Sequence, residues 1–294
     1  MGRQPAAEQV NGSRTVDENA FAKVEIGRVQ AYWDRRPCNI RHSPVAVGTR
    51  EYFDQVERRK YFVEPHIPGF AEFDKWRGKH VLEIGCGIGT DTINFARAGA
   101  RVTALDLSGE SLKLAGARAE LFGLREQIQF CQGDAEDLGA IVPKRPFDLV
   151  YSFGVIHHTP HPQRVVMQIP NYLHRDSELR IMLYSKISYK LFWVMREENA
   201  WDMSRIDELI ARASEAQTGC PVTYTYTFDQ VRRLLEGFQI LDIRKAHIFT
   251  WDIDAYKRYE YRKDAAWINV SDERLAELEE ELGWHTLVRA KFSG

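Results

Sequence analysis

The stretch Val81-Leu-Glu-Ile-Gly-Cys-Gly-Ile-Gly-Thr-Asp-Thr92 decides the fold of this chain. Its apolar start predicts a buried strand, because parallel strands that are covered on both faces lack polar alternation. The three alternating glycines then predict a sharp turn whose backbone a ligand can approach closely. Thr90, Asp91 or Thr92 can cap the following helix, whose free N–H groups would face that ligand. Taken alone, the glycines are equally compatible with a structural turn in any α/β protein.

The composition is that of an ordinary globular protein. Of 294 residues, 44% are hydrophobic and 28% are charged, and a net charge of -2 gives no reason to expect nucleic acid as a partner. No apolar run approaches the roughly 18 residues of a membrane span, and the polar segment Met1 to Asn19 lacks the apolar core of a secretory signal. The four cysteines form no C-x-x-C pair. The sequence therefore predicts a cytoplasmic protein with reduced thiols and without zinc.

Apolar runs and helical patterns alternate along most of the chain. Strands are predicted at residues 81–84, 101–106, 128–131, 147–152, 179–184, 238–248 and 284–291. Helices are predicted at residues 19–33, 70–76, 91–98, 111–122, 205–215, 227–235 and 275–282. A further helix over residues 165–173 is expected to kink at Pro170. This alternation indicates an α/β fold with a doubly wound parallel sheet.

Additions to this core give the predicted domain organisation. Residues 1–18 are predicted to be a flexible N-terminus, residues 19–76 a helical lid, and residues 77–294 the core. The lid mixes basic and aromatic residues, which suits an active-site cover or a solvated basic helix. An insertion at about 185–226 is expected to form a cap at the ligand-binding edge of the sheet, with a second aromatic insertion at about 251–267. A cap packed only for stability or dimerisation is the alternative.

Acidic residues accompany three consecutive strands. A Walker loop needs a lysine after its glycines, and a dinucleotide fingerprint needs a glycine at position 90, where this chain has Thr90. Glu83 inside the first strand would repel a diphosphate but tolerate a cofactor with a sulfonium and an ammonium group. Asp106 is placed to accept hydrogen bonds from two ribose hydroxyls, and Asp134 from an adenine amino group. Each acid can instead be a cap or turn former, but together they favour adenosine attached to a cationic amino acid chain.

Four motifs follow one another between about residues 75 and 185. They are residues 81–89, Ala104-Leu-Asp-Leu-Ser108, Gly133-Asp-Ala-Glu-Asp137 and Phe147-Asp-Leu-Val-Tyr-Ser-Phe-Gly-Val-Ile-His-His158. In this order they resemble the motifs of the class I S-adenosylmethionine-dependent methyltransferases. The ending Ile156-His-His158 is similar to members that act on small molecules, including quinones, tocopherols and sterols.

The resemblance implies a Rossmann-like fold with a seven-stranded, mostly parallel sheet whose last strand runs antiparallel. It implies S-adenosyl-L-methionine as cofactor, S-adenosyl-L-homocysteine as product, and no metal. The predicted cofactor-binding residues are Tyr32, Glu83, Gly85, Cys86, Gly87, Gly89, Thr90, Asp106, Leu107, Asp134, Ala135 and Ser152. By this resemblance the glycines lie against the methionine part, while Asp106 holds the ribose and Asp134 with Ala135 contacts adenine.

A hydroxyl or carbon acceptor must lose a proton, and His157 or His158 is the predicted base because imidazole titrates near neutral pH. Either histidine can instead be a packing residue. The fallback bases are His42, His66 and His161. The predicted substrate-side residues are Trp33, Tyr189, Phe192, Trp193 and Trp201. These aromatics favour a small apolar or aromatic acceptor, such as an isoprenoid-like, quinone-like or specialised metabolite, methylated on carbon or oxygen.

Three alternatives stay open at this point. The first is an acceptor with a phosphate or carboxylate held by Arg50, Arg58, Arg59 and Lys60. The second is a cofactor-binding scaffold subunit without catalysis, and the third is a dehydrogenase. The expected partner is a small-molecule substrate rather than nucleic acid or a membrane, and the leading helix suggests a homo-oligomer.

Overall fold

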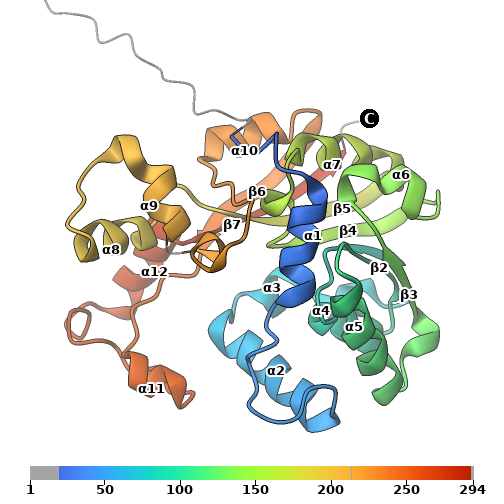
Figure 1. The fold of residues 1–294 in the computed structure, drawn as a ribbon, viewed down its shortest axis with the longest axis horizontal. Coiled ribbons are helices and arrows are strands. Elements are labelled where there is room, and N and C mark those ends of the chain that lie inside the picture. The colour runs from blue at the N-terminus through green and yellow to red at the C-terminus, as the bar shows by residue number, and fades with distance from the viewer. Residues whose placement is uncertain (1–19, 213, 293–294) are drawn as a thin grey trace, which may run out of the picture.

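The computed structural model describes residues 20–212 and 214–292, and a seven-stranded sheet forms its centre (Figure 1). The strands are β1 (His80–Ile84), β2 (Arg101–Asp106), β3 (Ile128–Gln132), β4 (Phe147–Phe153), β5 (Leu173–Tyr184), β6 (Phe238–Ala246) and β7 (His285–Phe292). They lie in the order β3-β2-β1-β4-β5-β7-β6, and β7 runs antiparallel to both of its neighbours. The predicted doubly wound, mostly parallel sheet with an antiparallel last strand is therefore confirmed.

Helices cover both faces of this sheet. They are α1 (Ile26–Arg35), α2 (Arg50–Val63), α3 (Ile67–Ala71), α4 (Thr90–Arg97), α5 (Gly109–Leu121), α6 (Leu138–Ile141), α7 (Pro162–Gln168), α8 (Tyr189–Glu197), α9 (Ile206–Arg212), α10 (Phe228–Leu234), α11 (Ile253–Lys257) and α12 (Asp272–Leu282). Val81 packs in one core with residues of α4, α5, α8 and α9. Leu82 and Ile84 pack in a second core with residues of α1, α6, α7 and α10. Successive residues of β1 thus face opposite helical layers, which explains why the strand is apolar throughout.

Parallel pairing brings the predicted site residues to one edge of the sheet. Ile84 pairs with Leu105, so the glycine turn after β1 lies beside the end of β2. Asp106 pairs with Gln132, so Asp134 follows on the next strand. Ligands of open α/β sheets bind at this carboxyl edge.

Two contacts order the N-terminal extension, one within it and one with the core. Thr49 caps α2 by accepting a hydrogen bond from the N–H of Tyr52. Beyond α2, the fully buried Arg180 on β5 donates to the carbonyl of Phe70 and to the carboxylates of Glu72 and Glu178. A buried guanidinium is stable only with such partners, so this contact fixes α3 against the sheet.

Helices follow β5 and β6 in the two segments predicted to be insertions. Residues 185–226 contain α8 and α9, and a capping box at Thr227 then starts α10. The second insertion contains α11 and docks on α2, because the ring of Phe62 stacks on Tyr261 at 4.4 Å and contacts Tyr256 at 4.9 Å. The boundaries of the lid, core and cap as separate units stay predictions.

Several local predictions were wrong. The leading helix starts at Ile26 rather than at residue 19, and the predicted flexible residues 1–18 lie outside the described residues. No side chain caps α4, because Gly89 occupies the N-cap with φ of 76° and Thr90, Asp91 and Thr92 belong to its first turn. Instead of kinking at Pro170, α7 ends at Gln168, and a 3-10 turn at Ile169–Tyr172 contains the proline.

Candidate cofactor and acceptor site

The glycine turn forms the floor of the site. Gly85, Gly87 and Gly89 have φ of 80°, 54° and 76°, values that glycine adopts without strain. The N–H groups of Gly85 and Cys86 both donate to the carbonyl of Leu105, at 2.7 and 3.0 Å. At Gly85 a Cβ atom would lie only 2.2 Å from Cγ2 of Val155. Both the backbone conformation and the packing against Val155 therefore favour glycine at position 85.

Replacing Gly85 with alanine is expected to lower the free energy of unfolding by about 2–4 kcal/mol, because both positive φ and the Val155 side chain oppose a Cβ. Gly116, inside α5, serves as the control, because no heavy atom of the described residues lies within 4 Å of the place where its Cβ would be. Gly116→Ala is expected to stabilise the chain by about 0.5–1 kcal/mol. Urea unfolding monitored by circular dichroism measures both, and equal stability of the two variants would contradict the expected clash at Gly85.

Asp106 stands at the centre of the site. One carboxylate oxygen accepts the N–H of Gly87 at 2.7 Å and the other accepts the N–H of Ser108 at 2.8 Å. Burial raises the pKa of Asp106 to about 6. A carboxylate has about four acceptor positions, so two remain for hydroxyl donors after these backbone bonds.

Asp134 and Ala135 follow β3 at the same edge. The Oδ1 atom of Asp134 accepts the N–H of Glu136 at 2.9 Å, which starts a short 3-10 turn. Burial raises the pKa of Asp134. The predicted cap interpretation and the predicted adenine contact are therefore compatible, because Oδ1 makes the cap and Oδ2 has no protein partner among the hydrogen bonds of the described residues.

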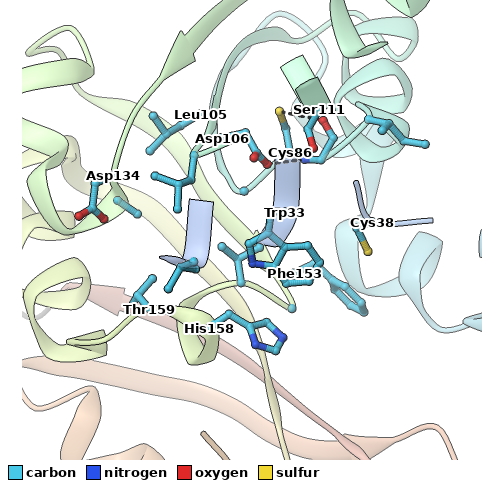
Figure 2. Close-up of a pocket in the computed structure, with 18 of the residues that line it drawn as sticks. Trp33, Cys38, Cys86, Leu105, Asp106, Ser111, Asp134, Phe153, His158 and Thr159 are labelled. Atoms are coloured by element: carbon cyan, nitrogen blue, oxygen red, sulfur yellow. Dashed lines mark hydrogen bonds between the residues drawn. The ribbon is translucent and has the colours of Figure 1, made fainter. Parts of the chain in front are cut away.

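A pocket of about 920 Å³, including its open mouth, lies above these residues (Figure 2). Predicted site residues that line it are Trp33, Gly85, Cys86, Gly87, Thr90, Asp106, Leu107, Asp134, Ala135 and His158. Lys60, which the sequence offered for an anionic acceptor, also lines it. Lining residues that the sequence did not assign to the site are Ile26, Val29, Cys38, Asn39, Ile88, Leu105, Ser111, Gly133, Phe153, Gly154, Val155 and Thr159. The pocket joins acidic hydrogen-bond acceptors to an apolar wall from α1, an arrangement that fits an adenosine with its ribose and aliphatic chain.

Other predicted cofactor residues lie outside this lining. Gly89 faces Ala115 of α5, and Ser152 donates to the carbonyl of Ile84 at 3.0 Å. Tyr32 is buried, and its hydroxyl lies 2.6 Å from Oγ1 of Thr218. These three residues support the pocket wall, and direct cofactor contacts by them stay predictions.

Glu83 is also outside the lining. It accepts a hydrogen bond from Thr92 beneath the glycine turn, and burial together with the neighbouring Asp91 raises its pKa to about 8. Asp91 itself is bound by Lys60 at 2.8 Å and by Tyr151 at 3.1 Å. In the folded chain Glu83 thus holds its proton more tightly than an ordinary glutamate, and its predicted role in selecting a cationic cofactor stays a prediction.

The raised pKa of Glu83 makes stability depend on pH. Because the folded chain binds this proton more tightly than the unfolded chain, its contribution is full below the ordinary value of 4.5 and is lost as pH rises toward about 8. Glu83→Gln is therefore expected to lose less stability than the wild type over this interval. Chemical unfolding across the pH range measures the difference, and Glu120→Gln on the exposed face of α5 is the control. Parallel curves for wild type and Glu83→Gln would contradict this expectation.

The two adjacent histidines have different surroundings. His157 is buried, neither of its ring nitrogens has a hydrogen-bond partner among the described residues, and its ring packs 4.0 Å from that of Tyr184. Burial lowers its pKa well below the ordinary value. His158 lines the pocket, with its Nδ1 at 2.8 Å from the carbonyl of Val222 and its ring 5.4 Å from that of Trp33. The geometry distinguishes a packing histidine from one that faces the cavity.

The tautomer of His158 follows from that carbonyl. Nδ1 must carry the proton, so Nε2 is the free acceptor, and it lies 3.9 Å from Oε2 of Glu215. Burial opposes the charged form, but the contact with Cys220 and the charge of Glu215 outweigh it and raise the pKa of His158. Glu215 accepts the hydroxyl of Tyr184 at 2.9 Å through Oε1, whereas Oε2 has no hydrogen-bond partner in the described part of the chain. No sequence motif marked Glu215.

The fallback bases lie elsewhere. His66 Nε2 is 3.0 Å from Nδ1 of His285, and burial lowers the pKa of His66 to about 3. Burial likewise lowers the pKa of His42 to about 4. His161 precedes α7, where its backbone N–H donates to Glu136. None of the three lines the pocket.

Three further ionisable side chains lie near this end of the pocket: Cys38 lines it, Glu215 lies 3.9 Å from His158, and Glu64 lies close to Lys60. Cys38 is exposed, yet burial raises the pKa of its thiol to about 12. Glu64 is 21% exposed, and burial raises its pKa to about 7. Glu215 is 34% exposed and lies close enough to influence the pKa of Cys38 and of Glu64.

The basic residues of α2 do not gather at the pocket. Arg50 donates to the carbonyl of Leu121, and Arg58 lies over the ring of Tyr259. Arg59 donates to the carbonyl of Tyr256 at 2.9 Å. Lys60 is the one member of the predicted group that lines the pocket. The arginines hold neighbouring segments, which removes the geometric basis for an arginine clamp on the acceptor.

The predicted aromatic substrate wall is also divided. Tyr189 and Trp193 line a second cavity, which shares no lining residue with the cofactor pocket. Phe192 and Trp201 are 43% and 62% exposed and line neither cavity. Among the predicted substrate residues, Trp33 alone is placed at the cofactor pocket.

A doubly wound sheet with an antiparallel last strand, and a pocket at its carboxyl edge lined by Asp106 and Asp134, fit the class of S-adenosylmethionine-dependent methyltransferases. A family model described as a methyltransferase domain matches residues 75–242, and the chain belongs to this family. It is an enzyme that uses S-adenosyl-L-methionine. A dehydrogenase is thereby excluded. Within the described residues, no helix is long and apolar enough to cross a membrane, and no three His, Cys, Asp or Glu side chains are grouped to hold a metal.

Curated relatives resemble part of the chain. Ubiquinone biosynthesis O-methyltransferase of Klebsiella pneumoniae subsp. pneumoniae is 38% identical over 89 residues, which cover 30% of this chain and 36% of the relative. The enzyme of the same name from Salmonella paratyphi A is 34% identical over 102 residues, covering 35% and 41%. The similarity thus spans well under half of the relatives' length.

Solved structures resemble the fold as a whole. Magnesium protoporphyrin IX methyltransferase from Synechocystis PCC 6803, solved with bound S-adenosylhomocysteine, superposes with a TM-score of 0.55 at 17% identity, covering 92% of this chain and 100% of that one. A methyltransferase from Mesorhizobium loti gives 0.52 at 21% identity, covering 76% and 96%. At this identity the likeness concerns the fold.

Proposed function

We propose that this enzyme methylates a hydroxyl group of a small aromatic, quinone-like or isoprenoid-like molecule, with His158 as the base. The observation that carries the proposal is the orientation of His158, whose Nδ1 is held by the Val222 carbonyl so that Nε2 is the acceptor. The partial similarity to ubiquinone O-methyltransferases supports an oxygen acceptor. A carbon acceptor next to a phenol hydroxyl uses the same base.

When bound, S-adenosyl-L-methionine supplies a methyl group whose bond to sulfur breaks as its bond to the acceptor oxygen forms. Asp106, Asp134 and the glycine turn would hold the cofactor, and the apolar face of α1 would exclude water. His158 takes the proton of the acceptor hydroxyl at Nε2, and Glu215 at 3.9 Å stabilises the resulting imidazolium. The protein thus aligns the acceptor and removes its proton.

The remaining alternatives have less support. A clamp of Arg58 and Arg59 on an anionic acceptor is disfavoured because both guanidinium groups contact the 253–261 segment. A scaffold without catalysis is disfavoured by the free Nε2 of His158 beside the cofactor pocket. We propose a cytoplasmic, small-molecule biosynthetic role; α1 packs over its own chain's pocket, and an oligomer formed through this helix stays a prediction.

A panel assay with radiolabelled S-adenosylmethionine tests the proposal. We expect methyl transfer to phenols or hydroquinones and none to their methyl ethers, because only the former have a proton for His158 to remove. Bulk tRNA and a histone-type protein are the control acceptors. Labelling of tRNA with no labelling of any small molecule would overturn the proposal, as would equal labelling of phenols and their ethers.

A further inference from the structure

The second cavity lies between α8 and the segment 247–267, at the same end of the molecule as α11 (Figure 1). It has a volume of about 1270 Å³, including its open mouth. Four of the seven tryptophans of the chain line it, namely Trp193, Trp251, Trp267 and Trp284. A stability core would bury such rings, but Trp193 is 44% exposed. The cavity therefore presents large aromatic faces to an open space, where planar molecules stack favourably.

Lys190 brings a positive charge to this cavity, and Asp264, whose Oδ1 accepts the N–H of Ala266 at 2.9 Å, brings a negative one. Lys190 lines the cavity from α8, and its Nζ lies 4.2 Å from the ring centroid of Trp284. Within the described residues Lys190 has no hydrogen bond or ion pair, and burial lowers its pKa while the charge of Glu215 partly offsets this. Arg196, at the exposed rim, is paired with Glu197 at 2.9 Å. Among the described residues, Lys190 therefore has no anionic partner at contact distance, whereas Arg196 has one.

The cavity is separated from the reaction centre by two stacked side chains. Trp284 forms its inner wall and packs on Tyr184, with ring centroids 4.4 Å apart. On the other side, the hydroxyl of Tyr184 donates to Glu215, which faces Nε2 of His158. Tyr184 also contacts His158 itself, with ring centroids 5.7 Å apart. The cavity therefore lies next to the reaction centre, two aromatic side chains away from His158.

We propose that this aromatic cavity binds the distal part of the acceptor, and that this part is a planar aromatic group with a carboxylate or other anionic substituent. Aromatic side chains stack on the ring, and Lys190 pairs with the anion in a partly desolvated site, where such a contact is strong. The assignment of the occupant as the acceptor rests on the proposed function. The existence of an anion-selective aromatic site does not.

Two fluorescent dyes test the site on the full chain, saturated with S-adenosylhomocysteine to fill the cofactor pocket. The anionic probe is 8-anilinonaphthalene-1-sulfonate, and the neutral probe is N-phenyl-1-naphthylamine. Trp193→Ala is expected to weaken both dyes about tenfold, because stacking is lost. Lys190→Met is expected to weaken the anionic dye about tenfold and to leave the neutral dye unchanged, because only the charge contact is lost.

Matched controls separate this site from general dye binding. Trp201→Ala removes an exposed tryptophan that does not line the cavity, and Lys257→Met removes an exposed lysine of α11. Both controls are expected to bind the dyes as the wild type does. Thermal melts confirm folding, and Lys190→Arg, which keeps the charge, should retain the anionic dye. If Trp193→Ala and Lys190→Met bind the anionic dye like the controls, the proposal is overturned.

Calorimetry with S-adenosylhomocysteine keeps this result distinct from the proposed function. Trp193→Ala and Lys190→Met are expected to bind it with wild-type affinity, because neither residue lines the cofactor pocket. Phenolic acids and their methyl esters then test the occupant, and Lys190→Met should lower kcat/KM for the acids about tenfold relative to the esters. Suppose that dye binding is anion-selective but Lys190→Met leaves the ratio of kcat/KM for the acids and the esters unchanged. The aromatic site would then be supported, and its assignment to the acceptor would be contradicted.

Discussion

Replacing His158 with glutamine is expected to lower kcat by about 10²–10⁴-fold, which is the usual contribution of a positioned general base. Glutamine retains a donor toward the Val222 carbonyl but provides no basic nitrogen at the place of Nε2. The neutral imidazole is the active form, so kcat of the wild type should rise with pH through a pKa above the ordinary value of 6.5, because the pKa of His158 is raised. The kcat of His158→Gln should not show this rise with pH.

Two measurements show that such a loss comes from chemistry. Calorimetry with S-adenosylhomocysteine should give wild-type affinity for His158→Gln, since the proposed base acts on the acceptor and not on the cofactor. His161→Gln is the matched control, because His161 does not line the cavity and should keep kcat. Full activity of His158→Gln would contradict the assignment of His158 as the base. So would a pH profile in which His161→Gln, and not His158→Gln, loses the rise of kcat with pH.

Asp106→Ala is expected to weaken cofactor binding by at least about 100-fold. Two hydroxyl donors would each lose a charge-assisted hydrogen bond of about 1.5–3 kcal/mol, and about 1.4 kcal/mol corresponds to tenfold. The N–H groups of Gly87 and Ser108 also lose their acceptor, so the glycine turn is less ordered. Because burial raises the pKa of Asp106 to about 6, wild-type affinity should itself fall as pH decreases through that value.

Calorimetric titration with S-adenosylhomocysteine measures both effects. Asp54→Ala, on the exposed face of α2, is the control and is expected to bind like the wild type at every pH. Unchanged affinity of Asp106→Ala at pH 8, together with a normal melting temperature, would show that the ribose lies elsewhere in the pocket.

Much of the sheet could be predicted because its signals are local. The run from Arg101 to Asp106 was predicted with its observed bounds, since an apolar strand between two helical patterns is distinct from both. By contrast, β5 starts at Leu173, six residues before the prediction, in a stretch where polar residues such as His174 and Asp176 lack apolar alternation. Register shifts in the pairing of β4 and β5 accommodate that polar start.

The cofactor half of the site was more predictable than the acceptor half. Glycines and acids at strand ends occupy positions that the sheet topology fixes, so Gly87, Asp106 and Asp134 were brought together as expected. Cys38 and Lys60 reach the pocket from the N-terminal extension, whose packing depends on contacts distant in sequence. No pattern in the sequence relates them to β1.

The acceptor half depends on which neighbour each side chain meets. Glu83 was predicted to act through its charge, but burial and Asp91 raise its pKa and favour the protonated form. His157 and His158 are adjacent residues of the same type, so the sequence does not distinguish them. In the structure the Val222 carbonyl orients His158, whereas Tyr184 covers His157. Such roles follow from tertiary contacts and become visible only in three dimensions.

The position of β7 has a consequence for biosynthesis. Residues His285–Phe292 leave the ribosome after the other six strands, yet they form an inner strand between β5 and β6. Until they emerge, the edge of β5 offers unpaired N–H and C=O groups, and β6 has no strand to pair with. Exposed edges of this kind pair readily with other chains. The nascent chain should therefore depend on chaperones up to this late step, and protease protection of β5 should appear only once β7 has been synthesised.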